Sequence, residues 1–280
     1  MPDVVRYSAD GFTTDFGMGA AWQHSVLETA PLHTHDFFEI FLVTAGQAVH
    51  LVNHSIQNVR AGDMVLIRPD DVHCYDFYQG HPFEFLNFSF TRETFNSIAR
   101  LTEPDNSVYE LSERPLPPVC TLSAGEMDFV VGNVNGMKEL RKKYTADYAR
   151  NCYKSFLAYL VCRFFLRRAQ GKDRAPLWLQ SLISQMESIE NFSEGFSRMV
   201  RLSGYTEEHL CRMMRKFYGT TPVGFINDLR LSYSLYLLAN TRWEIIEISE
   251  RCGFQTLSHF YHLFKRKYAM TPKKYRNLSQ

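Results

Sequence analysis

The last third of the chain contains the same unit twice, about fifty residues apart. The first copy carries Gly204 and then Thr221–Pro222, and the second carries Gly253 and then Thr271–Pro272. The threonine-proline pairs are fifty residues apart and the glycines forty-nine, so the second copy has one extra residue in its turn. Because both copies must fold alike, this repeat constrains the chain more than any other feature.

Each copy has the pattern of a helix, a glycine turn and a second helix. Apolar side chains recur at helical spacing on both sides of Gly253, at Ile245, Ile248, Leu257, Phe260, Leu263 and Phe264. Two helices joined by a short turn with glycine form a helix-turn-helix or an ordinary helical hairpin. The polar faces favour the first, because basic residues repeat in register: Arg212, Arg215 and Lys216 match His262, Lys265 and Arg266.

Residues 177–276 resemble the DNA-binding domain of AraC-type regulators. The resemblance rests on residues 248–254, 260–266 and 271–276 of the second copy and on the presence of both copies. It implies an all-α domain in which a helix predicted over Pro222–Leu238 holds two recognition helices about one DNA turn, or ~34 Å, apart. A capping box is predicted at Thr241–Glu244, where the second copy begins.

The same resemblance implies roles for individual residues. The base-reading candidates are Glu207, Glu208, Cys211 and Arg212 in the first copy and Leu257, Ser258, Tyr261 and His262 in the second. The phosphate-contact candidates are Thr206, Arg230, Thr256, Lys265, Arg266 and Lys274. Arginine can hold guanine through two hydrogen bonds and glutamate can accept from cytosine, so the first copy is predicted to be the stronger reader.

The net charge of +1 hides a division along the chain. Residues 1–122 contain 6 basic residues (Lys and Arg) and 16 acidic residues (Asp and Glu). Residues 123–175 contain 11 basic and 5 acidic residues, and residues 176–280 contain 14 basic and 9 acidic residues. Only the rear two thirds should therefore be attracted to phosphates.

The six cysteines show no spacing typical of a metal clip or a disulfide framework. Residues 1–26 lack the apolar segment of a signal peptide, and no apolar run approaches about 18 residues. These observations predict a cytoplasmic protein without a membrane partner.

The first third reads as short strands separated by turns, a pattern typical of a closed sandwich or barrel. Alternation over Leu32–Val43 places His33, His35, Phe37, Glu39 and Phe41 on one face of a strand. His33, His35 and Glu39 followed by Gly46, and then Gly62, Pro69 and His73, resemble the two motifs of the cupin barrel over residues 15–90.

The cupin resemblance implies a metal site at His33, His35, Glu39 and His73, which would suit zinc, nickel, iron or manganese. The alternative is that these side chains hydrogen-bond a sugar or one another. A barrel also encloses a pocket, the usual place for a small ligand, and Trp22, Phe37 and Asn87 are its predicted lining.

Residues 91–122 form a proline-rich connector, after which Ser123 and Glu126 make a capping box. Helices are predicted over Glu126–Lys143 and Asp147–Arg168, and a polar segment at Gly171–Pro176 marks a boundary. In AraC-type proteins the helices after the barrel commonly form the dimer interface, so a homodimer through residues 126–168 is predicted.

The chain is thus predicted to be an α+β multidomain protein. Residues 1–122 form a cupin-like effector-sensing barrel with its connector, residues 123–170 a helical dimerisation region, and residues 171–280 a DNA-binding domain with two helix-turn-helix motifs. The expected function is a transcriptional regulator, and more specifically an activator, that binds double-stranded DNA and works with RNA polymerase. It is not expected to be an enzyme.

The whole chain is most similar in pattern to the chitobiose and cellobiose operon regulators. This resemblance is carried by residues 62–67, by Tyr75–Phe77 after His73, by Leu86–Asn87 and by Trp178–Leu179. It implies a sugar or sugar phosphate as effector. The alternatives are a metal-dependent cupin enzyme or a metal sensor joined to a DNA-binding domain.

Overall fold

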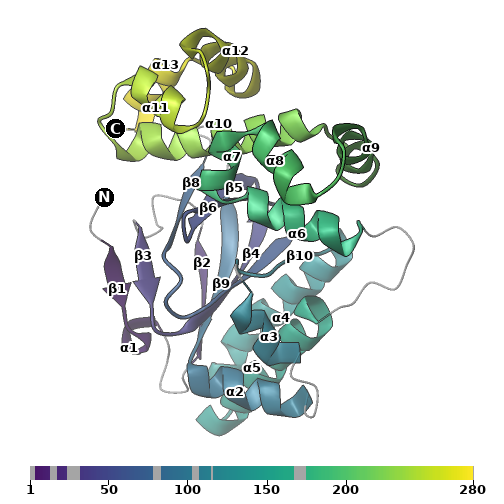
Figure 1. Cartoon of the computed structure of the whole chain (residues 1–280). Helices are drawn as coiled ribbons and strands as arrows, with labels where there is room; N and C mark the ends of the chain where they lie inside the picture. Colours follow the sequence, from purple (N-terminus) through teal and green to yellow (C-terminus); the bar gives the residue numbers. More distant parts are fainter. Residues whose placement is uncertain are drawn as a thin grey trace. The chain divides into compact units, whose positions relative to one another are not determined.

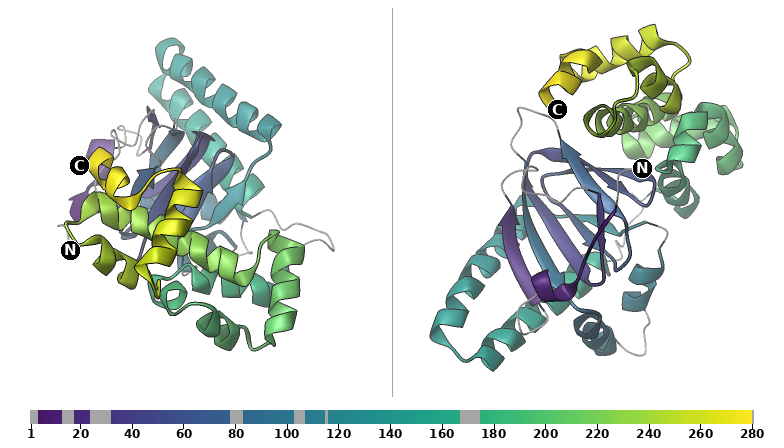
Figure 2. Two further views of the ribbon diagram at one scale, coloured as in Figure 1. Left: turned by 90° about the horizontal axis from the view of Figure 1, so that it is seen from above. Right: turned by 90° about the vertical axis from the view of Figure 1, so that its left-hand side faces the viewer.

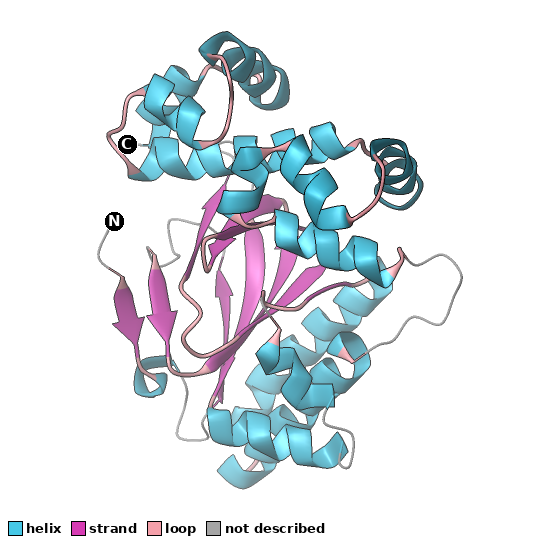
Figure 3. Ribbon diagram, in the orientation of Figure 1, coloured by secondary structure: helices cyan, strands magenta, loops and turns pink. Residues whose placement is uncertain are grey.

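The computed structural model describes residues 4–12, 18–23, 32–77, 83–102, 107–114, 116–166 and 175–279. It divides into two compact units, the first made of residues 1–47, 59–75 and 81–168 and the second of residues 48–58, 76–80 and 169–280. Strands and helices share the first unit, whereas helices dominate the second (Figure 3). This is the α+β organisation that the sequence predicts.

The strands of the described ranges form two five-stranded sheets (Figure 1). The first sheet has the order β1 (Val5–Tyr7), β3 (His33–His35), β8 (His73–Phe77), β5 (Gln47–Val52), β6 (Ser55–Arg60). The second has the order β10 (Val119–Thr121), β7 (Asp63–Ile67), β4 (Phe38–Ala45), β9 (Glu84–Phe90), β2 (Met18–Gln23). Strand β4 is central to the second sheet, pairing antiparallel with both β7 and β9.

The first six residues of β4 are all buried, because both faces of the strand are covered. Phe38, Ile40 and Leu42 belong to a cluster that the sheet shares with the helices of this unit. These helices are α2 (Arg92–Ala99), α3 (Ser107–Glu113), α4 (Ala124–Lys143) and α5 (Ala146–Leu160), and α4 and α5 run along the sheet in both views of Figure 2. The other short helices described in this unit are α1 (Ala9–Phe12), η2 (Arg100–Thr102) and η3 (Val161–Phe165).

The predicted single strand over Leu32–Val43 is wrong in one respect, because β3 and β4 belong to different sheets. The chain bends at Asp36 and Phe37, where the His35 ring donates from Nδ1 to the Phe37 carbonyl at 2.8 Å. Asp36 is held there by the backbone amide of Ala9, at 2.9 Å. The sequence pattern could not reveal this bend because both strands have the same period.

The capping box at the start of α4 is confirmed. Ser123 Oγ accepts from the Glu126 amide, and the Glu126 carboxylate accepts from the Ser123 amide at 2.9 Å. The second predicted helix is α-helical only to Leu160 and continues as a π-helix, η3, over Val161–Phe165.

The helices of the second unit follow one another closely in the sequence. They are α6 (Leu177–Met186), α7 (Ile189–Glu194), α8 (Phe196–Ser203), α9 (Glu207–Tyr218), α10 (Pro222–Asn240), α11 (Ile245–Arg251), α12 (Leu257–Tyr268) and α13 (Pro272–Ser279). The hairpin residues 48–58 belong to this unit, and Ile56 donates its amide to Glu187 O at 2.9 Å while Ile189 donates to His54 O at 3.0 Å.

Helix α10 begins at Pro222, as predicted, since proline fits the first turn where its missing N–H is not needed. The predicted capping box at Thr241–Glu244 is wrong. Thr241 instead closes α10, because its hydroxyl donates to Leu237 O at 2.6 Å, and Glu244 is the N-cap of α11 without a side-chain capping bond.

The turn of the second copy packs against the end of α7. Gly253 has φ +87°, and a Cβ atom at this position would overlap the backbone of Ser193. Arg230 of α10 donates to Phe192 O at 3.0 Å and to Ser193 O at 2.9 Å, which satisfies carbonyls that end the helix. Gly204, in the first copy, has φ +67° with open space around it.

These two glycines provide a matched pair for a stability test. Gly204→Ala should lower the free energy of unfolding by about 1 kcal/mol, the cost of a left-handed backbone for alanine. Gly253→Ala should cost clearly more, about 3 kcal/mol, since backbone must also move. Urea denaturation followed by circular dichroism measures both, and equal losses would contradict the close packing.

Candidate functional site

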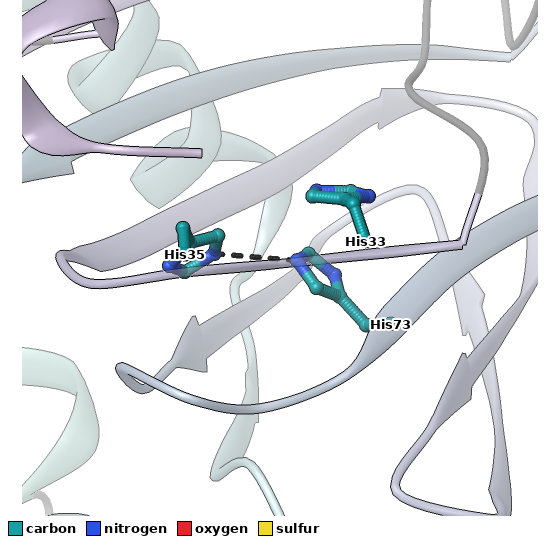
Figure 4. A group of neighbouring side chains, drawn as sticks. All are labelled: His33, His35 and His73. Atoms are coloured by element: carbon teal, nitrogen blue, oxygen red, sulfur yellow. Dashed lines mark hydrogen bonds between the residues drawn. The ribbon is translucent and has the colours of Figure 1, made fainter. Parts of the chain in front are cut away.

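Three histidines meet inside the first unit (Figure 4). His33 and His35 lie on β3 and His73 lies on β8, and His33 and His73 are paired in register. One ring nitrogen of each lies within 4.8 Å of the others, and all three side chains are buried. These are three of the four predicted metal ligands.

The hydrogen bonds of the cluster show which nitrogen atom of His35 can act as a ligand. A carbonyl oxygen only accepts, so the bond to Phe37 O places the proton of His35 on Nδ1 and leaves a lone pair on Nε2. This Nε2 lies 3.3 Å from His73 Nε2, which therefore carries the proton between them. Burial lowers the pKa of His35 to about 4, so the ring is neutral at neutral pH, the form that binds metals.

The fourth predicted ligand, Glu39, lies beside His35 rather than at the centre of the cluster. Its Oε2 is 3.7 Å from His35 Nε2, and Tyr75 donates to Oε1 at 3.4 Å. Burial raises the pKa of Glu39 to about 7, and hydrogen bonds from Asn87 and Tyr75 partly oppose this shift. The donor set of three imidazoles with an adjacent carboxyl fits a divalent transition metal.

A buried ion pair anchors the loop that precedes His73. Arg68 donates from Nε and Nη2 to the two carboxylate oxygens of Asp71, at 2.9 and 2.8 Å. The amide of Asp70 donates to His35 O at 2.9 Å, which ties the loop to β3. The loop therefore sets the distance between the strands that carry His35 and His73.

The three predicted pocket residues differ in their surroundings. Phe37 is buried and stacks flat on His35, with ring centroids 4.2 Å apart. Asn87 lies on β9 beside Glu39, and its Oδ1 is a buried atom without a hydrogen-bond partner. Trp22 pairs with Leu86 in the sheet, but its side chain lies outside the described residues. Sequence reasoning gave no role to Tyr75, although its position two residues after His73 on a strand puts it on the same face.

In the second unit, α9 exposes polar side chains on one face and buries Leu210 and Met214 on the other. Glu207, Glu208, Cys211, Arg212 and Arg215 line one surface hollow. The four predicted base-reading residues of the first copy are thus brought together.

Helix α12 repeats this arrangement fifty residues later. Phe260, Leu263 and Phe264 are buried, Ser258 and His262 are exposed, and Leu257 and Tyr261 are partly exposed. Both helices have twelve residues, so the extra residue of the second copy lies in the turn between Gly253 and Thr256.

The predicted phosphate contacts include both residues that begin these helices. Thr206 accepts from the His209 amide at 3.3 Å and Thr256 from the His259 amide at 3.2 Å. Lys265, Arg266 and Lys274 are exposed. Arg230 differs, because its guanidinium is engaged by the carbonyls at the end of α7 and has a pKa lowered by burial. A structural role accounts for Arg230 better than a phosphate contact.

Comparison with known proteins finds two family models in this chain. An AraC-like ligand-binding domain matches residues 18–125, and a helix-turn-helix domain matches residues 191–278. The chain belongs to the AraC family of transcriptional regulators. This assignment agrees with the predicted β-rich sensor and with the repeated helical motif, and it makes the chain a regulator rather than an enzyme.

Relatives of this AraC-family chain align over most of its length. The transcriptional activator RhaS of Mannheimia succiniciproducens is 24% identical over 261 residues, covering 89% of this chain and 90% of its own. The transcriptional activator RhaR of Escherichia coli is 23% identical, covering 88% and 87%.

Among solved structures, an apo form of ToxT from Vibrio cholerae is 14% identical, covers 96% of this chain and 99% of its own, and has a TM-score of 0.42. No helix within the described residues has the length and apolar character needed to cross a membrane.

The histidine cluster yields a metal-binding prediction. The full-length protein, stripped with chelator, should take up about one cobalt(II) ion per chain, with the visible absorption of a nitrogen-ligated site. His73→Asn should weaken uptake by at least about tenfold, because a ligand is lost. His54→Asn, at an exposed histidine outside the cluster, should change nothing. Equal cobalt uptake by both variants would contradict the predicted metal site.

Proposed function

We propose that this protein is a one-component transcriptional activator in which the N-terminal domain binds a small molecule and the two helix-turn-helix motifs bind a promoter. The observation that carries the proposal is the pair of matched helices α9 and α12. Each begins at a threonine cap, buries an apolar face and exposes basic residues in its last turn. Activation is supported by the relatives RhaS and RhaR, which are named transcriptional activators, and an activator would contact RNA polymerase.

The proposed effector is a sugar or sugar phosphate. The interior of the first unit combines aromatic rings with hydrogen-bonding groups, since Phe41, Tyr75 and Phe85 pack together next to Glu39 and Asn87. Aromatic faces and a few convergent polar atoms are what a saccharide requires. The free acceptor at Asn87 Oδ1 would suit a sugar hydroxyl. The pattern shared with chitobiose and cellobiose operon regulators also supports this class.

We assign base reading mainly to α9. Its exposed Arg212 can donate two hydrogen bonds to guanine, and Glu208 can accept from cytosine. In α12 the corresponding exposed residues are Ser258 and His262, with Leu257 and Tyr261 offering apolar contact. Thr206, Thr256, Lys265, Arg266 and Lys274 are the proposed phosphate contacts, which set register and salt dependence.

Two substitutions separate these roles. Arg212→Ala should abolish preference at one base pair, a loss of about 1–3 kcal/mol of discrimination, with little change elsewhere in the site. Lys265→Ala should weaken binding to all sequences alike and reduce the salt slope by about one. Selection from a random DNA library followed by binding titrations measures both. Uniform weakening by Arg212→Ala would refute its role as a base reader.

The proposed dimer interface is the α4–α5 pair, within residues 126–168. Its surface exposes Phe129, Tyr144, Tyr148 and Tyr159, and the rings of Phe129 and Tyr159 lie 5.4 Å apart. Tyr144 and Tyr148 form a second pair, with ring centroids 4.8 Å apart, and exposed aromatic side chains are typical of protein interfaces. A second copy of this chain is the proposed occupant.

The dimer can be tested by placing a charge in this aromatic group. Phe129→Glu should convert a dimer into a monomer at micromolar concentration, because a buried unpaired charge is costly in an interface. Leu101→Glu, at another exposed apolar residue of the same unit, should leave the dimer intact. Light scattering measures the molar mass of each variant in solution. A native protein that is monomeric at micromolar concentration would contradict the proposal.

A second candidate function is a metal sensor, favoured by the histidine cluster. Zinc, nickel, iron or manganese would be held by His33, His35 and His73, with Glu39 adjacent. A thermal-shift screen of saccharides, run before and after chelation, distinguishes the two candidates. Stabilisation by a saccharide in the stripped protein supports the sugar sensor, and stabilisation by metal alone supports the metal sensor.

A further inference from the structure

Three aromatic rings pack together where α9 begins. Trp178 of α6, Tyr205 of the turn and His209 of α9 lie against one another in the same unit. The ring centroids of Trp178 and Tyr205 are 4.3 Å apart, and those of Tyr205 and His209 are 4.8 Å apart with an interplanar angle of 21°. Trp178 and His209 are 5.7 Å apart. The His209 ring is therefore in contact with both Trp178 and Tyr205.

His209 directs one nitrogen atom at Arg212. Its Nδ1 lies 3.0 Å from Arg212 Nη2. A guanidinium can only donate, so Nδ1 is the acceptor in this bond. Arg212 has five N–H groups, and one bond to His209 leaves the others available for a base.

Such a bond matters because an exposed arginine has many rotamers. Ordering a long side chain costs up to about 2 kcal/mol of conformational entropy, and that cost is reduced when the side chain is held before binding. A direct contact from the protein to the arginine therefore affects how well one base pair is distinguished from another.

The second copy lacks this arrangement. Phe254 and His259 occupy the places of Tyr205 and His209, but their rings meet edge to face, with centroids 6.0 Å apart and an angle of 79°. At the place of Arg212, fifty residues on, stands His262. The second copy thus supplies an internal control.

We propose that His209 is a positioning residue for base reading: the Trp178–Tyr205 stack orients its ring, and Nδ1 holds the Arg212 guanidinium in place for a guanine edge. The inference rests on the proposed role of Arg212 in DNA reading. His209 itself need not touch DNA, and its effect is confined to the base pair that Arg212 reads.

The test uses the full-length protein and a random double-stranded DNA library. His209→Phe keeps an aromatic ring in the stack but removes the acceptor, and His209→Asn removes the ring but keeps an oxygen acceptor near the position of Nδ1. His259→Phe is the matched control in the second copy, and Arg212→Ala marks the base pair at issue. Circular dichroism melts confirm that each variant is folded.

His209→Phe should reduce preference at the base pair identified by Arg212→Ala by about two- to tenfold, the effect of one hydrogen bond. Affinity for unrelated DNA should stay the same. His209→Asn should retain at least part of the preference, and His259→Phe should retain all of it.

Three results would overturn the inference: full preference in His209→Phe, equal loss at every base pair of the site, or a loss of preference in His209→Asn as large as that in His209→Phe. If Arg212→Ala itself changes no single base pair, the proposed DNA-reading role of Arg212 fails instead. The two failures are thus distinguishable.

Discussion

The DNA-binding unit depends on one close approach between backbone segments. Gly253 lies so near Ser193 that a side chain has no room, and Arg230 donates to the carbonyls of Phe192 and Ser193 at the same point. Arg230 also lies over the ring of Phe254, 5.7 Å from its centroid. The end of α7, the middle of α10 and the turn before α12 are therefore fixed together, and the orientation of the second recognition helix follows from this contact.

The first unit depends on a different constraint, the burial of ionisable groups between two sheets. Burial disfavours charge, which lowers the pKa of His35 and raises the pKa values of Glu39 and Tyr75. The cluster is held together by hydrogen bonds among neutral groups, such as that of His35 to Phe37 O. A metal ion or a saccharide bound here would each replace part of this hydrogen-bond network.

Local signals in the sequence predicted the structure well. Pro222 predicted the start of α10 and Ser123 the start of α4, because a cap depends on residues within one turn. The repeat predicted α9 and α12 with their exposed faces. The bend at Asp36 and Phe37, the role of Thr241 as the end of α10, and the engagement of Arg230 could not be predicted in the same way. Each depends on partners distant in the sequence or on a choice between two local bonds of similar strength.

Helices α9 and α12 differ in their first turns as well as in the side chains proposed to contact bases. Helix α9 has Glu207 and Glu208 in its first turn, whereas α12 has no acidic residue there and carries Lys265, Arg266 and Lys267 in its last turn. Carboxylates repel phosphates, so the start of α9 is suited to base edges rather than to the DNA backbone. The first turn of α12 has no acidic residue, so no carboxylate there would repel a phosphate from its backbone amides. These differences agree with the proposal that α9 does most of the base reading, and they favour phosphate contacts at α12.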